Sequence, residues 1–300
     1  MSSRFLFIGL LLITACAPKT ILLTRSQLLM GHVPVNVTIE TTPDRKAEAL
    51  ELSEEAYARA KTLENKISEY QPNSEVSCLN RQAGRGFCIL SPETYALLEE
   101  ATDLSHKTGH AFDIRFASPT EGGRKGRIIF ESAGRVRLSH PETRIGVGAI
   151  GKGFIVDQMI EFLRSKGVAK ALVDAGGDLK ALGGPWAVAI QRPGGNIGET
   201  QALPPITNLA LSTSGNYEQE GHILDPRSGK QVTRPESVTV LAKSHTLADA
   251  LATAFYVLGE KESLLYQKKF PGIEMIWANP VGPFRSYPSP SELLKSGVSK

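Results

Sequence analysis

Gly146, Gly148, Gly151 and Gly153 lie close together near the middle of the chain, in the run I-G-V-G-A-I-G-K-G-F-I-V-D. The pattern predicts a turn, a helix over 152–166 that ends before a glycine, a strand over 171–173 and a second glycine turn with an acid. Free amides at the start of such a helix suit a phosphate, and Lys152 adds a positive charge there. No Ser or Thr follows the lysine, so this is not a Walker A loop. A plain tight turn with Lys152 in solvent stays open as the alternative.

The composition is that of an ordinary globular protein. The chain has 300 residues, of which 41% are hydrophobic and 22% charged, enough for a large core in one or two domains. The formal net charge is only +3, and the basic residues form no long run. Nucleic acid is therefore not expected as a partner.

The N-terminus has the pattern of an export signal. Arg4 precedes an apolar run over 5–13 that is too short to span a membrane, and I-T-A-C follows at 13–16. Small residues before Cys16 resemble the lipobox of bacterial lipoproteins. That resemblance implies a signal peptide at 1–15, a lipidated Cys16 with a tether to residue 30, and a protein anchored to a bacterial membrane facing the periplasm. A plain secretory signal cut nearby is the alternative.

Export leaves two cysteines in the mature chain. Cys78 and Cys88 enclose a segment that can turn back on itself, and an oxidising compartment allows the pair to bridge. We hypothesise a disulfide, which sequence alone does not prove. A metal site at these cysteines would need further ligands nearby, and the sequence shows none.

The periodicity along the chain predicts separate helices and clustered strands. Helices are expected over 45–67, 91–109, 152–166 and 246–258, with a short one later, and 69–86 and 109–127 are expected as loops. Strands are expected over 33–41, 128–130, 136–138, 171–173, 179–182, 186–190, 209–212, 222–224, 238–241 and 274–278. A Pro/Ser-rich, flexible tail is expected over 286–300. This mixture favours an α+β fold with mixed or antiparallel sheets and packed helices.

A-D-A-L-A-T-A, over 248–254, is a candidate metal site. Asp249 and Thr253 are four residues apart, so they share one face of the predicted helix. A carboxylate and a hydroxyl are hard oxygen ligands that suit Mg²⁺. The alternative is a buried alanine-rich helix with Asp249 near its positive N-terminal end.

Two further stretches carry candidate functional residues. His222 lies between S-T-S-G-N-Y and L-D-P-R-S-G, and a histidine there can accept a proton near neutral pH. The alternative is a histidine at a strand edge, bonded to Asp225. Ser214 lacks the elbow of a nucleophilic serine, so we interpret it as a hydroxyl donor to a ligand or a turn. G-H-A-F-D, over 109–113, is a weaker candidate for the edge of a ligand site.

Taken in order, these stretches resemble the ApbE family of bacterial FAD:protein FMN transferases. I-S-E-Y-Q-P-N-S-E-V-S-C-L-N resembles the first ligand loop of that family, and G-H-A-F-D resembles its G-A-F-D. G-A-I-G-K-G-F-I-V-D resembles A-I-A-K-G-Y-A-V-D, and D-A-G-G-D-L resembles N-A-G-G-D-I. S-T-S-G-N-Y, H-I-L-D-P-R-S-G and A-D-A-L-A-T-A-F-Y-V-L-G follow in the family's order. The resemblance covers nearly all of the mature chain and implies an ApbE-type, T-fold-like transferase domain over 31–285.

The resemblance also implies a reaction and a set of site residues. FMN would pass from FAD to a threonine or serine of an acceptor protein, such as a subunit of a redox pump or reductase, with release of AMP and dependence on Mg²⁺. His222 would be the base, and the metal ligands would be the side chains of Asp249 and Thr253 and the backbone oxygen of Ala149. The residues implied to line the FAD site are Met30, Tyr70, Ala111, Phe112, Asp113 and Lys152.

This chain departs from the family pattern in two places. The family usually has an acid three residues before the metal-binding alanine, where this chain has Gly146, so one ligand to the flavin or its ribityl chain is missing or supplied elsewhere. The usual P-T-V-G-P-L and W-G-F run after F-D is replaced by I-R-F-A-S-P-T-E-G-G-R-K-G-R. Two other functions therefore stay open, namely Mg²⁺-dependent FAD hydrolysis and non-catalytic flavin binding.

Overall fold

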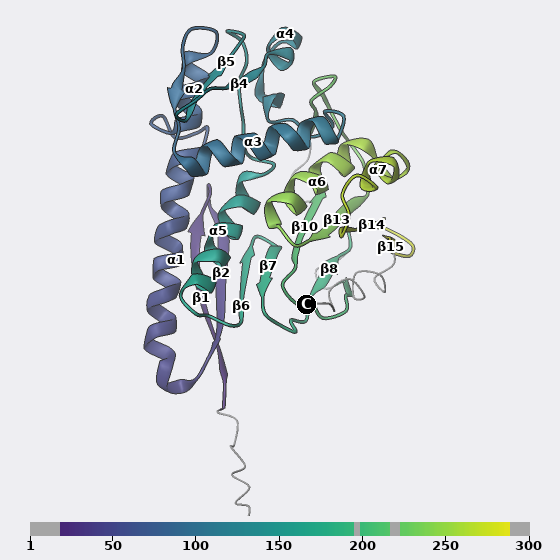
Figure 1. The fold of residues 1–300 in the computed structure, drawn as a ribbon. Helices are drawn as coiled ribbons and strands as arrows, with labels where there is room; N and C mark the ends of the chain where they lie inside the picture. The colour runs from purple at the N-terminus through teal and green to yellow at the C-terminus, as the bar shows by residue number, and fades with distance from the viewer. Residues whose placement is uncertain (1–18, 195–198, 217–222, 289–300) are drawn as a thin grey trace, which may run out of the picture.

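The fold is built on an eight-stranded sheet in which every neighbouring pair of strands is antiparallel (Figure 1). The computed structural model describes residues 19–194, 199–216 and 223–288. Across the sheet the strands are β1 (Ile21–Leu29), β2 (Val33–Thr41), β6 (Ala171–Ala175), β7 (Asp178–Leu182), β10 (Ala210–Gly215), β13 (Ser237–Ala242), β14 (Glu274–Ala278) and β15 (Arg285–Tyr287). With its packed helices, this sheet confirms the predicted α+β class.

Three helices cover one face of the sheet, and a small hairpin covers the other. Successive side chains of a strand point to opposite faces, so Ala210 on β10 joins the main core while its neighbour Leu211 joins a second, smaller one. The main core lies under α1 (Lys46–Ile67), α5 (Gly151–Ser165) and α6 (His245–Leu258). The second core lies under the hairpin of β8 (Ala189–Gln191) and β9 (Thr200–Ala202), where Trp186 and Ile206 are also buried.

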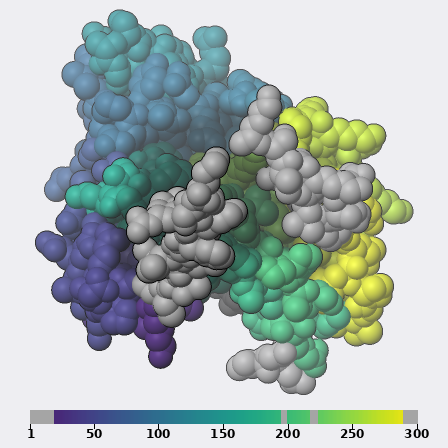
Figure 2. All heavy atoms as spheres, turned by 60° about the horizontal axis from the view of Figure 1, so that its bottom comes forward, coloured from purple at the N-terminus to yellow at the C-terminus, as the bar shows by residue number. Residues whose placement is uncertain are grey.

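A small lobe stands beyond the end of the sheet at which α5 begins (Figure 1). We use "small lobe" for residues 75–138. Its three-stranded sheet has the order β3 (Cys88–Ile89), β5 (Arg135–Leu138), β4 (Ile128–Phe130). Its helices are α2 (Glu75–Gln82), α3 (Pro92–Lys107), η2 (Ile114–Ala117) and α4 (Glu121–Lys125). In Figure 2 the small lobe, in blue and teal, lies on one side of the molecule, and the yellow C-terminal strands lie on another.

The remaining elements are short. They are η1 (Pro43–Arg45), α7 (Glu260–Gln267) and the two-stranded pair β11 (Leu224–Asp225) and β12 (Lys230–Gln231). Within the described ranges, no helix is both long and apolar enough to cross a bilayer.

Strong local patterns predicted the main elements correctly. Strands β2 and β14 have the predicted bounds, and α1, α3, α5 and α6 lie within one or two residues of theirs. For α6 the predicted start signal operates as expected, since the Ser244 hydroxyl accepts a hydrogen bond from the backbone of Leu247. The hairpin of β4 and β5 is also confirmed.

The expected tether is wrong over most of its length. Residues 21–29 form strand β1, which pairs with β2 at all nine positions, from Ile21 opposite Thr41 to Leu29 opposite Val33. As an edge strand it keeps many polar side chains, and this composition obscured its alternation. Cys16 and the signal segment lie outside the described residues.

Two stretches expected as loops contain helices. Helix α2 begins at the Ser74 cap, whose hydroxyl accepts a hydrogen bond from the Ser77 backbone, and it buries Val76 and Leu79. The span 109–127 contains η2 and α4. Both α2 and α4 are too short for helical periodicity to be visible in the sequence. At the other end of the chain, β15 extends to Tyr287, inside the expected tail, and residues 289–300 lie outside the described ranges.

The hypothesised disulfide is present. Cys78 on α2 is bonded to Cys88 on β3, across a sequence separation of 10 residues. The bond therefore fixes helix α2 to the three-stranded sheet of the small lobe.

We expect the double variant Cys78→Ala/Cys88→Ala to lose about 2–4 kcal/mol of unfolding free energy, because the bond limits the freedom of the unfolded chain. Guanidinium unfolding of oxidised protein and variant measures the difference. Reductant should lower the midpoint of the unmodified protein and leave that of the variant unchanged. Equal midpoints for both oxidised proteins would show that the bond adds no stability.

Candidate active site

The glycine-rich turn before α5 is clamped from two sides. The Asn80 side chain donates to the Ile145 carbonyl oxygen at 2.9 Å and accepts from the Ile145 amide at 2.7 Å. The Gly146 amide donates to the carbonyl oxygen of Ile114 at 2.8 Å. The turn is thus fixed against both α2 and η2, and it delivers Ala149 to the start of α5.

Helices α5 and α6 cross in close contact at Gly153. A Cβ atom at this position would lie 2.5 Å from the His245 carbonyl oxygen and 2.9 Å from the Asp249 Cβ atom. Glycine is therefore required here for space. The contact also lets the Gly153 amide donate to Asp249 Oδ2 at 2.9 Å. It brings the candidate metal helix against the start of α5.

Asp249 is a buried carboxylate that retains only 5% of its accessible surface. Burial raises the pKa of Asp249 to about 6, and the negative charge of Asp178 acts in the same direction, while Lys152 and the Gly153 amide oppose them. Burial disfavours the ionised form. A cation at this point would favour that form.

Thr253 lies one turn after Asp249 on α6, and its hydroxyl reaches β10. Thr253 Oγ1 is 3.4 Å from the Ser214 hydroxyl oxygen. The predicted spacing thus places the hydroxyl of Thr253 and the carboxylate of Asp249 on one helix face, next to Ser214.

Lys152 forms an ion pair with Asp178 at the start of β7, and its side chain is 29% exposed. Asp178 Oδ1 also accepts the Thr213 amide at 2.8 Å. Asp178 is the last acid of the D-A-G-G-D-L motif, and the sequence alone does not indicate its role. The structure joins the second glycine turn to the first through this pair.

The oxygen donors suit a hard divalent cation. Lys152 forms an ion pair with Asp178, and its charge also acts on the nearby Asp249, so two carboxylates lie near one lysine. Mg²⁺ accepts oxygen donors of these types, namely the Asp249 carboxylate, the Thr253 hydroxyl and the backbone oxygen of Ala149. Three such donors would leave coordination positions for water and phosphate oxygens. The described ranges contain no group of three or more His, Cys, Asp and Glu side chains suited to a metal. Binding of a cation here would therefore depend on the mixed set of carboxylate, hydroxyl and backbone oxygen donors.

The turn between β1 and β2 lies at the same end of the sheet. Met30, Gly31 and His32 all have positive φ angles in this turn. The Gly176 amide, in the turn that leads to Asp178, donates to the Pro34 carbonyl oxygen at 3.0 Å. Met30 therefore lies at the same end of the sheet as the turn that leads to Asp178.

Tyr70 and the G-H-A-F-D segment differ sharply in exposure. Tyr70 is 86% exposed, whereas Ala111 and Phe112 are buried. The Asp113 carboxylate accepts hydrogen bonds from Arg115 and Ser105. Burial acts to raise the pKa of Asp113, but the Arg115 guanidinium outweighs it and holds the pKa below its usual value. The contact of this segment with FAD stays a prediction.

His222 lies outside the described residues. Its sequence neighbour Ile223 is buried, and the Asp225 carboxylate is paired with Arg227 at 3.0 Å. The role of His222 therefore remains as the resemblance implies it.

Asp157 is a positioning residue that sequence reasoning missed. Its carboxylate accepts the backbone amides of His245 and Thr246, each at 2.9 Å, and the hydroxyls of Ser244 and Thr246. It also forms a buried ion pair with Lys180 of β7. Asp157 thus caps α6 from α5 and sets the position of Asp249 and Thr253. The one sequence signal for the role of Asp157 is its position at the end of the G-F-I-V-D run.

Comparison with known proteins identifies relatives of this chain. The sequence model of the ApbE family matches residues 30–277. The FAD:protein FMN transferase of Treponema pallidum (strain Nichols) is 30% identical over 78% of this chain and 78% of its own length. That of Vibrio cholerae is 29% identical over 67% of this chain and 72% of its own length.

Solved structures agree with the sequence matches. The flavin transferase ApbE from Vibrio cholerae superposes with a TM-score of 0.77 at 25% identity, covering 91% of this chain and 98% of its own. The ApbE protein of Thermotoga maritima also reaches 0.77, at 24% identity, over 91% of this chain and 99% of its own. The fold described above is therefore the fold of those proteins.

Proposed function

Since this chain belongs to the ApbE family, we propose that it transfers FMN from FAD to a threonine or serine hydroxyl of an acceptor protein, with Mg²⁺ and with release of AMP. The observation that carries the proposal is the buried Asp249 carboxylate beside the Lys152–Asp178 pair, at the start of α5. Such a site combines a helix N-terminus, a cation and hard oxygens, as a pyrophosphate substrate requires.

The reaction exchanges one P–O bond for another. The acceptor oxygen bonds to the phosphorus of the FMN half, and the bond from that phosphorus to the bridging oxygen breaks. AMP leaves with the bridging oxygen, and the hydroxyl proton passes to a base. A bound Mg²⁺ would polarise the phosphoryl oxygens and stabilise the charge that builds on them.

The residues of the chain divide these tasks. Asp249, Thr253 and the Ala149 carbonyl oxygen would hold the metal, and the α5 amides with Lys152 would face the phosphates. Asp178 orients the Lys152 ammonium through their ion pair. His222 would take the proton from the acceptor hydroxyl.

We expect His222→Ala to keep FAD binding and to slow transfer by about 10²–10⁴, the usual loss for a general base. FAD titration by fluorescence measures binding, and covalent labelling of the acceptor measures transfer. His106→Ala, at an exposed histidine on α3 of the small lobe, is the matched control. A wild-type rate for His222→Ala would remove this residue from the mechanism.

We also propose that the protein is exported and anchored through Cys16, facing the periplasm, with an acceptor in a flavin-carrying subunit of a redox pump or reductase. The I-T-A-C sequence at 13–16 supports the anchor. The mass of the mature N-terminal peptide tests it, because lipidation of Cys16 adds acyl chains to that residue alone.

One assay tests the proposed activity. The chain is mixed with FAD, Mg²⁺ and an acceptor domain, and the acceptor is examined by flavin fluorescence on a denaturing gel and by intact mass. Covalent flavin that disappears with a chelator is the expected result. AMP release without labelling would instead make the protein an FAD hydrolase, and bound FAD without either product would make it a flavin-binding protein.

A further inference from the structure

A side chain at position 146 would meet two other side chains. A Cβ atom there would lie 2.9 Å from Glu69 Oε1 and 3.0 Å from the Phe116 ring. Unlike Gly176 or Gly183, Gly146 has no positive φ angle, so its backbone conformation does not require glycine. The carboxylate of Glu69 thus lies where a side chain at position 146 would begin.

Glu69 is held firmly in this place. It follows the end of α1, and its backbone oxygen accepts the Ser77 hydroxyl at 3.1 Å. Burial raises the pKa of Glu69, and backbone amides of Glu69, Val147 and Gly148 act against this as hydrogen-bond donors to the carboxylate. Two of these donors belong to the turn that carries Ala149. The half-buried carboxylate is therefore part of the glycine-rich turn.

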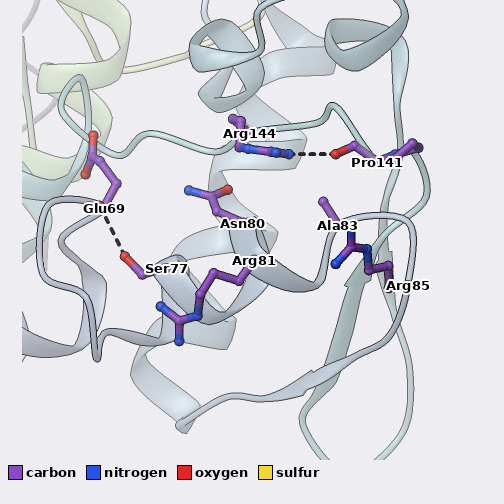
Figure 3. A pocket seen from close by; sticks show the side chains of 8 residues that line it. All are labelled: Glu69, Ser77, Asn80, Arg81, Ala83, Arg85, Pro141 and Arg144. Carbon is purple, nitrogen blue, oxygen red and sulfur yellow. Dashed lines mark hydrogen bonds between the residues drawn. The ribbon is translucent and has the colours of Figure 1, made fainter.

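The surroundings of Glu69 leave part of its carboxylate available to a ligand. Glu69 lies at one end of a cavity of about 330 Å³, which also contains Arg81, Arg85 and Arg144. Figure 3 shows its carboxylate pointing away from Arg81 and Arg85. Among the described residues, no lysine, arginine or histidine forms an ion pair with it. Neighbouring Tyr70 is the most exposed aromatic side chain among these residues, at 86%.

We infer that Glu69 supplies, from the end of α1, the carboxylate that the family pattern places at position 146, and that it accepts a hydrogen bond from bound FAD. This inference rests on the proposed function for its ligand. An ionised carboxylate only accepts hydrogen bonds, and it repels the pyrophosphate. Its partner on FAD is therefore a hydroxyl or N–H group of the neutral parts of the molecule.

An exchange of the two positions tests the inference. In full-length protein, with neither Mg²⁺ nor acceptor present, Glu69→Ala should weaken FAD binding by about 10- to 100-fold, as loss of a hydrogen bond to a charged group does. Gly146→Asp should also weaken it, because the new side chain collides with Glu69. The double variant Glu69→Ala/Gly146→Asp should bind FAD within a few-fold of the unmodified protein. Fluorescence titration measures FAD binding by the unmodified protein, the two single variants and the double variant.

Two further variants keep the test decisive. Glu51→Ala, at an exposed position of α1, should bind FAD normally. Glu69→Gln preserves the shape and should still lose affinity, which separates the role of the charge from a folding defect. Normal binding by Glu69→Ala would overturn the inference. A double variant as weak as Glu69→Ala would also overturn it, since Glu69 would then only brace the turn. If the unmodified protein bound no FAD, the proposed function itself would fail.

Discussion

Replacing Asp249 by asparagine should reduce FMN transfer by at least about 10³-fold, equivalent to the several kcal/mol that a bound cation contributes to phosphoryl transfer. Asp249 is the one carboxylate in the proposed donor set, and amide oxygens bind Mg²⁺ more weakly than carboxylates do. Covalent labelling of an acceptor at saturating FAD, over a series of Mg²⁺ concentrations, measures the loss. Higher Mg²⁺ should restore part of the rate.

The stability of this variant provides the control. The folded-state pKa of Asp249 is raised to about 6, so at neutral pH the buried charge opposes folding in the absence of a metal. Asp249→Asn should therefore be at least as stable as the unmodified protein without Mg²⁺. Asp103→Ala, at an exposed carboxylate of α3, should leave transfer unchanged. Full transfer by Asp249→Asn would refute the metal site.

Replacing Asp157 by alanine should cost about 3–5 kcal/mol of unfolding free energy, because it leaves the buried Lys180 ammonium without its partner. The same change leaves the amides of His245 and Thr246, in the first turn of α6, without their acceptor, although the Ser244 cap remains. Urea unfolding with a tertiary-structure probe measures the loss. Glu161→Ala, one turn later on α5 at an exposed position, should change stability by less than about 1 kcal/mol.

The pH dependence of this difference follows from the shifted pKa of Asp157. Burial acts to raise that pKa, but the Lys180 charge and the donated hydrogen bonds outweigh it and lower the value. A lowered folded-state pKa means that the stabilisation is fully present above the ordinary aspartate value near 4 and is lost as the pH falls below it. The difference in unfolding free energy between the unmodified protein and Asp157→Ala should therefore become smaller in acid. A gap that is constant down to pH 2 would show that the carboxylate charge contributes nothing.

Local patterns predicted this fold where they were long, and failed where they were short or polar. The periodicity of α1 and the alternation of β2 extend over enough residues to be read directly. Edge strand β1 and the eight-residue α2 depend on their partners, β2 and the small lobe. Their stability comes from tertiary packing, which a local window does not contain.

The site was predictable in the same uneven way. Asp249 and Thr253 share a helix face, so their spacing alone placed them together. The roles of Asp157 and Glu69 depend on contacts with residues 88 and 77 positions away, at His245 and Gly146. Nothing in their immediate neighbours reveals such partners. A departure from a family motif, as at Gly146, is the one sequence signal that pointed to such a contact.

In a protein anchored as proposed, strand β1 would also set the height of the active site above the membrane. With the proposed anchor at Cys16, the five-residue step to Ile21 spans at most about 18 Å, and the nine residues of β1 add a rigid rise of about 30 Å before Met30. The chain enters β1 at the end of the sheet opposite to the start of α5 (Figure 1). The short linker and the rigid strand would thus hold the active site at a fixed height, where it reaches hydroxyls about 30–50 Å from the bilayer. Acceptor domains that present their threonine or serine within that layer would be its substrates, and those held flush with the lipid would be excluded.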